Sequence, residues 1–170
     1  MIVEPLVRIP VGVVVERRKA TSQWVDFLWR PVAVLPDRPQ MPAWTLMHGD
    51  AETATFYAGA AEIGLYRTET PRYRENLHAG GGLWVVLRST GTEPALQLVA
   101  VTADPSEGEA FTEAGGDLVD QVPMPETIRA VVADFIAEHH VEDAFVKRKR
   151  DRADPEALAR RGPLADKDRK

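Results

Sequence analysis

The segment that decides the fold runs from Val7 to Glu16 and reads Val-Arg-Ile-Pro-Val-Gly-Val-Val-Val-Glu. Its apolar side chains recur at every second position, the period of a strand with one buried face. These residues are Val7, Ile9, Val11, Val13 and Val15. A second apolar run, 24–35, follows a basic turn, so the two predict a hairpin with a long loop. Pro10 and Pro31 cannot donate to a sheet ladder, and we expect each at an edge, a bulge or a strand start.

Further strands are predicted along the chain. Residues 52–65 alternate, with a small-residue centre at 58–61 that predicts a bulky group packed across it. Residues 83–102 form the clearest hairpin, with strands 83–88 and 96–102 around a turn at Gly91. The proline-rich segment 36–42 is predicted to be a stiff, extended connection. Residues 103–117 are predicted to form a loop or a short helix.

One helix is predicted near the C-terminal end of the domain. Pro125 suits the first turn of a helix, and apolar residues repeat at helical spacing from Ile128 to Ile136. We expect this helix, 125–141, to lie against one face of a single sheet. The predicted fold class is therefore α+β: a mainly antiparallel sheet of about five or six strands, packed by one C-terminal helix.

Composition narrows the class of protein. The chain has 170 residues and no cysteine, which fits one domain and excludes disulfides, thiolate metal sites and cysteine nucleophiles. The apolar run near the N-terminus is interrupted by charges and prolines, so no signal peptide is expected. No stretch approaches the length of a membrane helix. These features predict a cytoplasmic protein without a membrane span.

Charge is divided unevenly. Residues 147–170 contain ten Lys or Arg and five Asp or Glu, so this tail carries +5 against a total of −5. We predict one domain over 1–146 and a charged, flexible, disordered tail over 147–170. Such a tail either contacts nucleic acid, an acidic partner or the acidic body of its own chain, or only solubilises the protein. The interspersed acids favour solubilisation, and the acidic body disfavours nucleic acid as a partner.

No catalytic constellation emerges from the sequence. Residues 138–142, Glu-His-His-Val-Glu, place imidazole and carboxylate groups within one helical turn, but a metal site needs further convergent ligands. The glycine run 79–82 precedes a strand and lacks a phosphate-binding lysine, which favours a simple turn. Carboxylates such as Asp26 and Glu62 are too numerous for a pair to be diagnostic. We therefore predict no catalytic residue, no metal and no cofactor, and lean away from an enzyme.

The most distinctive polar region is the connection 68–82. It groups Arg72, Tyr73, Arg74 and Asn76 between two predicted strands, where binding residues are often found. Two arginines there suit an anionic ligand. The alternative is that Tyr73 and Leu77 anchor the connection while its charges face water.

The tryptophans supply a second candidate. The basic residues near Trp24 and Trp29 could form with them a surface that stacks on bases or a nucleotide; these are Arg17, Arg18, Lys19, Arg30 and Arg38. A protein interface is the other interpretation, and it rests on Trp24, Trp29 and Trp44. If they are exposed, they form an interaction surface, because aromatic-rich patches mark interfaces. The alternative is that solvated charges cover core tryptophans.

Two segments resemble a known family. They are Ile-Pro-Val-Gly-Val-Val-Val-Glu-Arg-Arg at 9–18, continued by Trp-Arg-Pro-Val-Ala-Val-Leu-Pro at 29–36, and Tyr-Arg-Glu-Asn-Leu at 73–77 before Leu-Trp-Val-Val-Leu-Arg at 83–88. Over about residues 5–145 the chain resembles the uncharacterised bacterial domain-of-unknown-function family DUF3305. Genes of that family tend to lie near those for formate dehydrogenase and molybdenum cofactor handling. The glycines at 80–82 depart from the polar turn expected in the family.

The resemblance implies an accessory role and transfers no catalytic residue. Our first hypothesis is a non-enzymatic protein that binds a protein partner, such as a formate dehydrogenase or a cofactor-handling protein, and assists molybdoenzyme maturation. The second is a protein that binds a small anion or cofactor through the 68–82 connection. The third is an enzyme whose carboxylates converge only in space, which perturbed carboxylate pKa values in a cleft would indicate.

Overall fold

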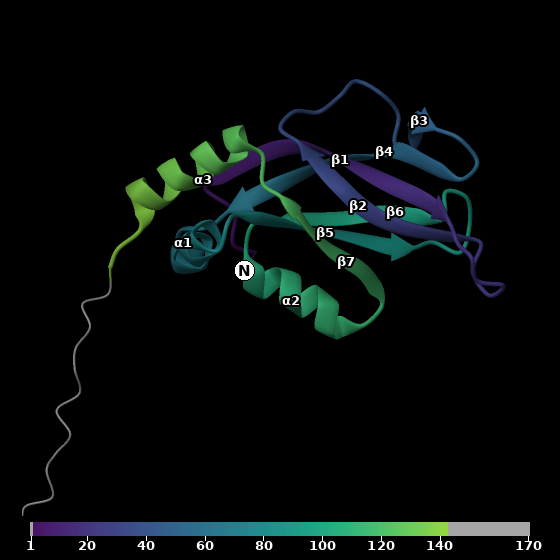
Figure 1. Ribbon diagram of the computed structural model, residues 1–170. Helices are drawn as coiled ribbons and strands as arrows, with labels where there is room; N and C mark the ends of the chain where they lie inside the picture. Colours follow the sequence, from purple (N-terminus) through teal and green to yellow (C-terminus); the bar gives the residue numbers. More distant parts are fainter. Residues whose placement is uncertain (1, 143–170) are drawn as a thin grey trace, which may run out of the picture. The chain divides into compact units, whose positions relative to one another are not determined.

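The computed structural model describes residues 2–142, and the described residues up to His140 form one compact unit. The predicted tail, 147–170, lies outside the described residues. Within them are seven strands and three α-helices (Figure 1). The elements are β1 (Val7–Lys19), β2 (Phe27–Leu35), β3 (Thr45–Gly49), β4 (Thr53–Leu65), the 3₁₀ turn η1 (Arg67–Glu69), α1 (Thr70–His78), β5 (Gly82–Ser89), β6 (Leu96–Thr102), α2 (Pro105–Ala114), β7 (Asp117–Pro123) and α3 (Glu126–His139).

The strands form two antiparallel sheets. One has the order β2-β1-β4-β3 and the other β6-β5-β7. The α+β class and both predicted hairpins are confirmed, but the single sheet is corrected to two. The reason is that β5 pairs only with β6 and β7, so a new sheet begins after α1. Alternation along a strand shows which face is buried and carries no information about which strand is its neighbour.

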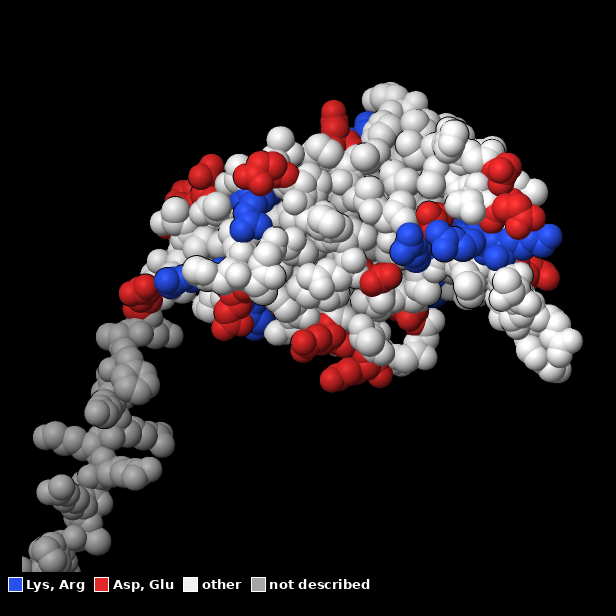
Figure 2. All heavy atoms as spheres, viewed as in Figure 1, with Lys and Arg blue, Asp and Glu red and all other residues white. Residues whose placement is uncertain are grey.

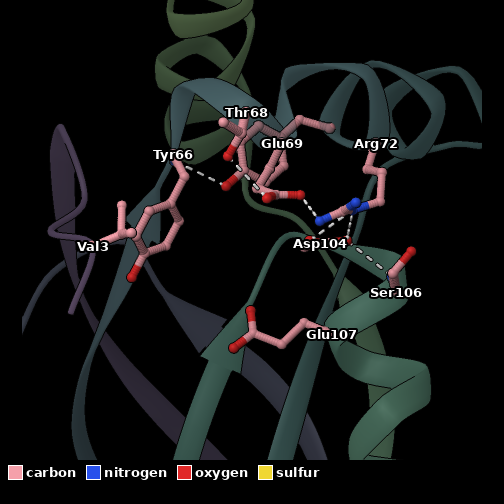
Figure 3. A pocket seen from close by; sticks show the side chains of 9 residues that line it. Val3, Tyr66, Thr68, Glu69, Arg72, Asp104, Ser106 and Glu107 are labelled. Carbon is pink, nitrogen blue, oxygen red and sulfur yellow. Dashed lines mark hydrogen bonds and ion pairs between the residues drawn. The ribbon is translucent and has the colours of Figure 1, made fainter. Parts of the chain in front are cut away.

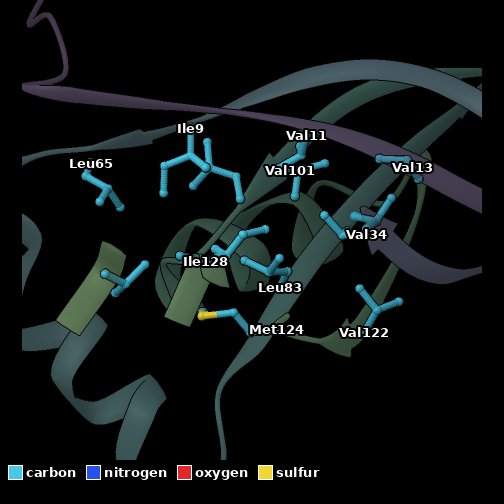
Figure 4. Close-up of a cluster of buried hydrophobic side chains, with 14 of the residues drawn as sticks. Ile9, Val11, Val13, Val34, Leu65, Leu83, Val101, Val122, Met124 and Ile128 are labelled. Carbon is cyan, nitrogen blue, oxygen red and sulfur yellow. The ribbon is translucent and has the colours of Figure 1, made fainter. Parts of the chain in front are cut away.

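The core lies between the sheets (Figure 4). β1 contributes the alternating residues predicted from the sequence, and Val11, Val13 and Val15 are fully buried. β5 contributes Leu83, Val85 and Leu87 from the opposite sheet. Full burial of each such side chain stabilises the fold by about 1.5–3 kcal/mol.

Pro31 lies where the sequence predicts, whereas Pro10 lies inside the central strand β1, opposite Glu62 of β4. Pro10 precedes the β1–β2 pairing, which begins at Gly12, so its missing N–H costs no ladder bond on that side. Pro31 lies in the edge strand β2, next to the irregularity opposite Val14 and Val15. The small-residue centre of β4 is crossed by residues 43–44: a Cβ added at Gly59 would lie 3.4 Å from the Cβ of Ala43.

Helices α1 and α3 lie together at one end of the two sheets, which we call the closed end (Figure 1). Helix α3 agrees with the predicted 125–141 helix and buries Ile128, Val132 and Phe135. Helix α1 corrects the prediction of an irregular connection at 68–82. Its buried residues are Thr70, Tyr73 and Asn76, so the inward face is mostly polar and shows no apolar period.

Helix α2 covers the outer face of the β6-β5-β7 sheet and resolves the ambiguity at 103–117. A Cβ at Gly108 would overlap the indole ring of Trp84, so glycine permits this close contact. The opposite end of the sheets carries the β1–β2 and β5–β6 connections, and none of the helices described within residues 2–142 lies there (Figure 1); we call it the open end. No helix in residues 2–142 has the length and hydropathy needed to span a membrane.

Candidate functional site

A pocket of about 500 Å³ lies at the closed end, beside the predicted ligand-binding residues (Figure 3). Its lining includes Arg72 of α1 and three acids, Glu69, Asp104 and Glu107. Arg72 Nε donates hydrogen bonds of 2.9 Å to both carboxylate oxygens of Asp104. The same guanidinium forms an ion pair with Glu69. Arg72 is therefore already neutralised by the protein, and the pocket as a whole is acidic.

Asp104 ties this arrangement to the fold. It is 5 % exposed and caps the N-terminus of α2 by accepting a hydrogen bond of 2.9 Å from the backbone N–H of Ser106. A buried carboxylate needs such partners, because an unpaired buried charge is costly. Arg72 thus joins α1 to the start of α2.

Asn76 is a structural residue at the closed end. Its Nδ2 donates 2.9 Å hydrogen bonds to the carbonyls of Gly82 and Ala103, and its Oδ1 accepts one of 2.9 Å from the N–H of Gly82. At 3 % exposure it is closed to solvent, and these three bonds fix the glycine turn before β5. Arg129 further holds that turn by donating to the carbonyls of Leu77 and Gly80.

Tyr73 is also buried, at 1 % exposure. Its hydroxyl accepts a hydrogen bond of 3.0 Å from the N–H of Tyr66. Burial raises the pKa of Tyr73 to about 12, because the phenolate would lose its hydration. The side chain therefore stays neutral and anchors α1, as in the alternative interpretation of the sequence.

Arg74 lies apart from Arg72. The two are separated by two positions on α1 and so point to different sides of the helix. Arg74 Nη1 lies 3.3 Å from Nε2 of His140, beside the end of α3. The four residues predicted to share one ligand site are thus two buried anchors and two divergent arginines.

The histidine segment at 138–142 holds no cluster suited to a metal. Within residues 2–142 no group of three or more His, Asp or Glu side chains is arranged to hold an ion. The ring of His139 packs against Phe135 with centroids 4.5 Å apart, and His140 Nδ1 lies 3.3 Å from the Thr70 hydroxyl. Both imidazoles contribute to packing at the closed end.

The open end contains an aromatic cluster between the sheets. Trp29 of β2 meets Trp44 edge to face, with centroids 5.9 Å apart, and lies at the same distance from Phe56 of β4. Together with Phe27 these rings line a pocket of about 400 Å³ beneath residues 93–95 of the β5–β6 connection. Trp44 has a φ of 65°, a left-handed conformation that is uncommon for a bulky residue. Such strain is typical of positions that the surrounding structure holds for a purpose.

Several exposed apolar side chains lie at this end, while others, including Ile2, Leu6 and the closed-end pocket residue Val3, lie elsewhere. Trp24, in the β1–β2 connection, is 85 % exposed. Four more lie on that connection, on β2 or on β3: Val25, Leu28, Leu46 and Met47, each at least 44 % exposed. Figure 2 shows a row of Lys and Arg side chains at this end, above a projection without charged groups. We call the five apolar residues the open-end patch.

The three predicted interface tryptophans therefore share one end of the molecule. Trp24 is exposed, whereas Trp29 and Trp44 are partly buried against the core. Phe27 and Phe56, which complete the cluster, were not singled out from the sequence. The predicted strand pattern contains the signal, since Trp29 and Phe56 lie on β2 and β4, the two strands that flank β1.

The fold and these features define an α+β protein of two antiparallel sheets with an exposed aromatic end. Residues 10–149 match the family described as "Protein of unknown function (DUF3305)", and the chain belongs to that family. No curated protein and no solved structure matches the chain.

Proposed function

We propose that this protein is a non-enzymatic accessory protein that binds a protein partner through its open-end patch. The observation that supports the proposal is the 85 % exposure of Trp24, at an end of the molecule where four further apolar side chains are exposed on the β1–β2 connection, β2 and β3. Burial of apolar surface stabilises a protein by about 25 cal/mol of free energy for each Å² removed from water. Large apolar patches that stay exposed therefore mark interaction sites. Tryptophan is also the residue type most enriched among side chains that dominate binding energy.

The more specific proposal is assistance in the maturation or assembly of a bacterial molybdoenzyme, such as a formate dehydrogenase, in the cytoplasm. Its support is the gene neighbourhood that we expect from the resemblance to DUF3305 family members; membership of that family itself is shown over residues 10–149. The partner would be the apo-enzyme or a cofactor-handling protein.

Binding of a small anion at 68–82 is the weaker candidate. A pocket of about 500 Å³ exists there. However, an incoming anion must displace Asp104 and Glu69 from Arg72. Arg74 points to a different side of α1 and does not line the pocket. Glu107 does line it, and its carboxylate further reduces the attraction for an anion.

The test is capture from the native cytoplasm under molybdate-replete conditions. Tagged wild-type protein is compared with a Trp24→Ala, Leu28→Ala variant and with Val131→Ala, which removes an exposed apolar side chain at the closed end. We expect a formate dehydrogenase subunit or a cofactor enzyme with wild type and Val131→Ala, but not with the double variant. Equal recovery by all three proteins would contradict binding at the open end.

A further inference from the structure

Arg17 is an unusual cation within the described residues. It is partly buried on β1, yet its guanidinium makes no ion pair and no side-chain hydrogen bond with any residue of 2–142. Its basic neighbours are paired: Arg18 and Arg30 with Glu16, and Lys19 with Glu52. A partly desolvated guanidinium without an acceptor is unfavourable unless a ligand or water supplies one.

Aromatic rings hold Arg17 in place. The centre of its guanidinium lies 4.3 Å from the ring centroid of Phe27, 5.0 Å from Phe56 and 5.8 Å from Trp29. These cation–π contacts do not use up the N–H donors as hydrogen bonds. A carboxylate matches the fork geometry of those donors.

The pocket around Arg17 limits what can enter. Asp26 and Glu93, both exposed, contribute carboxylates to the lining of the same pocket of about 400 Å³. Two acids beside one cation disfavour a polyanion such as nucleic acid. They also repel a single carboxylate, but both acids are exposed, so solvent and salt screen that repulsion while the partly buried Arg17 offers its donors. One acidic side chain is therefore the anionic group most compatible with the pocket.

The neighbouring sheet edge favours an extended segment. β3 is the edge strand of its sheet, and its residues 46–49 are all exposed. Trp44, immediately before β3, lines the Arg17 pocket, as does Asp26 at the end of the β1–β2 connection. A peptide that adds as a strand to β3 and continues past Trp44 can therefore bring a further residue toward the pocket.

We propose that Arg17 receives one Asp or Glu side chain of an extended partner segment whose apolar residues cover the open-end patch. This inference rests on the proposed function, because it names the chemistry of the partner at the same surface. The partner segment is thus apolar with a single acidic residue, and Arg17 binds the carboxylate of that residue.

The experiment is selection of random linear peptides, displayed on phage, against the full-length protein. We expect the selected peptides to share one Asp or Glu flanked by apolar residues. Replacing that Glu by Gln in a synthetic peptide should weaken its binding to the wild-type protein about tenfold, the effect of losing a charge-assisted hydrogen bond. Because this change is in the peptide, it does not depend on the folding of any variant.

Variants of the protein complete a double-mutant cycle between Arg17 and the Glu of the peptide. Arg17→Gln should weaken the Glu peptide to the same extent and leave the Gln peptide unchanged, whereas Arg17→Lys should recover part of the loss. Glu93→Gln should strengthen the Glu peptide a few-fold. Arg30→Gln is the matched control, because Arg30 lies at the same end but is paired with Glu16.

The outcomes separate the two proposals. If peptides bind in a Trp24-dependent manner but Glu-to-Gln replacement or Arg17→Gln has no effect, the role of Arg17 is wrong and the binding surface stands. If selection yields no peptide, or only peptides whose binding survives Trp24→Ala, both proposals are contradicted.

Discussion

The two ends of the molecule use the same kinds of side chain in opposite ways. At the closed end, Arg72 is paired with Asp104 and Glu69, and the polar groups of Tyr73 and Asn76 are buried and hydrogen-bonded. At the open end, Arg17 has no acid partner within residues 2–142, and Trp24 is exposed. An arginine in a pocket is therefore a candidate for binding only when the fold has not already supplied its counter-ion.

Mutations at the closed end are therefore expected to lower the free energy of unfolding, and mutations at the open end to lower the affinity for a partner. Buried polar groups are costly to leave unpaired, so their removal is felt in the free energy of unfolding. Exposed side chains contribute little to that free energy, and their removal is felt only when a partner is present.

The largest effect is expected for Asn76→Ala. It leaves the N–H of Gly82 and the carbonyls of Gly82 and Ala103 without partners, and we expect a loss of about 3 kcal/mol in the free energy of unfolding. Urea unfolding followed by tryptophan fluorescence measures it. Glu75→Ala, at an exposed position of the same helix, is the control. A loss below that of the control would show that the closed end is not held by this network.

Arg72→Ala is expected to cost about 2 kcal/mol, since it leaves the buried carboxylate of Asp104 without its cation. Half-exposure of Arg72 keeps the effect below that of a fully buried pair. Thermal unfolding at neutral pH is the measurement, with Arg67→Ala, an exposed neighbour, as control. An unchanged melting temperature would instead suit the hypothesis that Arg72 is free to bind an anion.

Tyr73→Phe is expected to cost about 1 kcal/mol, because the N–H of Tyr66 loses its acceptor. It also has a pH signature. The pKa of Tyr73 is raised from 10.0 to about 12, so the unfolded chain ionises first as the pH rises. The stability that comes from keeping Tyr73 neutral is complete below pH 10 and is lost as the pH rises through 12.

The measurement for Tyr73 is the free energy of unfolding of both proteins between pH 9 and 12. Wild type should lose more stability than Tyr73→Phe over this range, so the gap between them narrows. Parallel curves would show that Tyr73 does not sense the buried environment of the closed end.

Trp24→Ala should have the smallest effect on stability, less than about 0.5 kcal/mol, because the side chain is 85 % exposed. The same variant should lose binding to the selected peptides. A large loss of stability would mean that Trp24 supports the fold, which would remove the contrast between the two ends.

Much of the fold follows from the sequence, since the alternation over 7–15, the 83–102 hairpin and the 125–141 helix all appear as predicted. Helix α1 does not, because its buried face consists of Thr70, Tyr73 and Asn76 and lacks an apolar period. The division into two sheets also cannot be predicted from the sequence, because tertiary packing decides which strands pair with each other.

The candidate site is less predictable. Trp24, Trp29 and Trp44 can be singled out as aromatic residues, but their exposure depends on which end the helices cover. Arg17 lies in a run of four charged residues, 16–19, and nothing in that run distinguishes it. Only the positions of Phe27, Phe56 and Glu16 show that Arg17 is enclosed by rings while its neighbours are paired.

The four tryptophans allow the most direct test, because three lie at the open end and Trp84 lies under α2. Indole N–H resonances of the ¹⁵N-labelled protein would be recorded while the tightest selected peptide is added to saturation. If the open end is the binding surface, the signals of Trp24, Trp29 and Trp44 shift and that of Trp84 does not. A shift of Trp84 with the other three unchanged would contradict it.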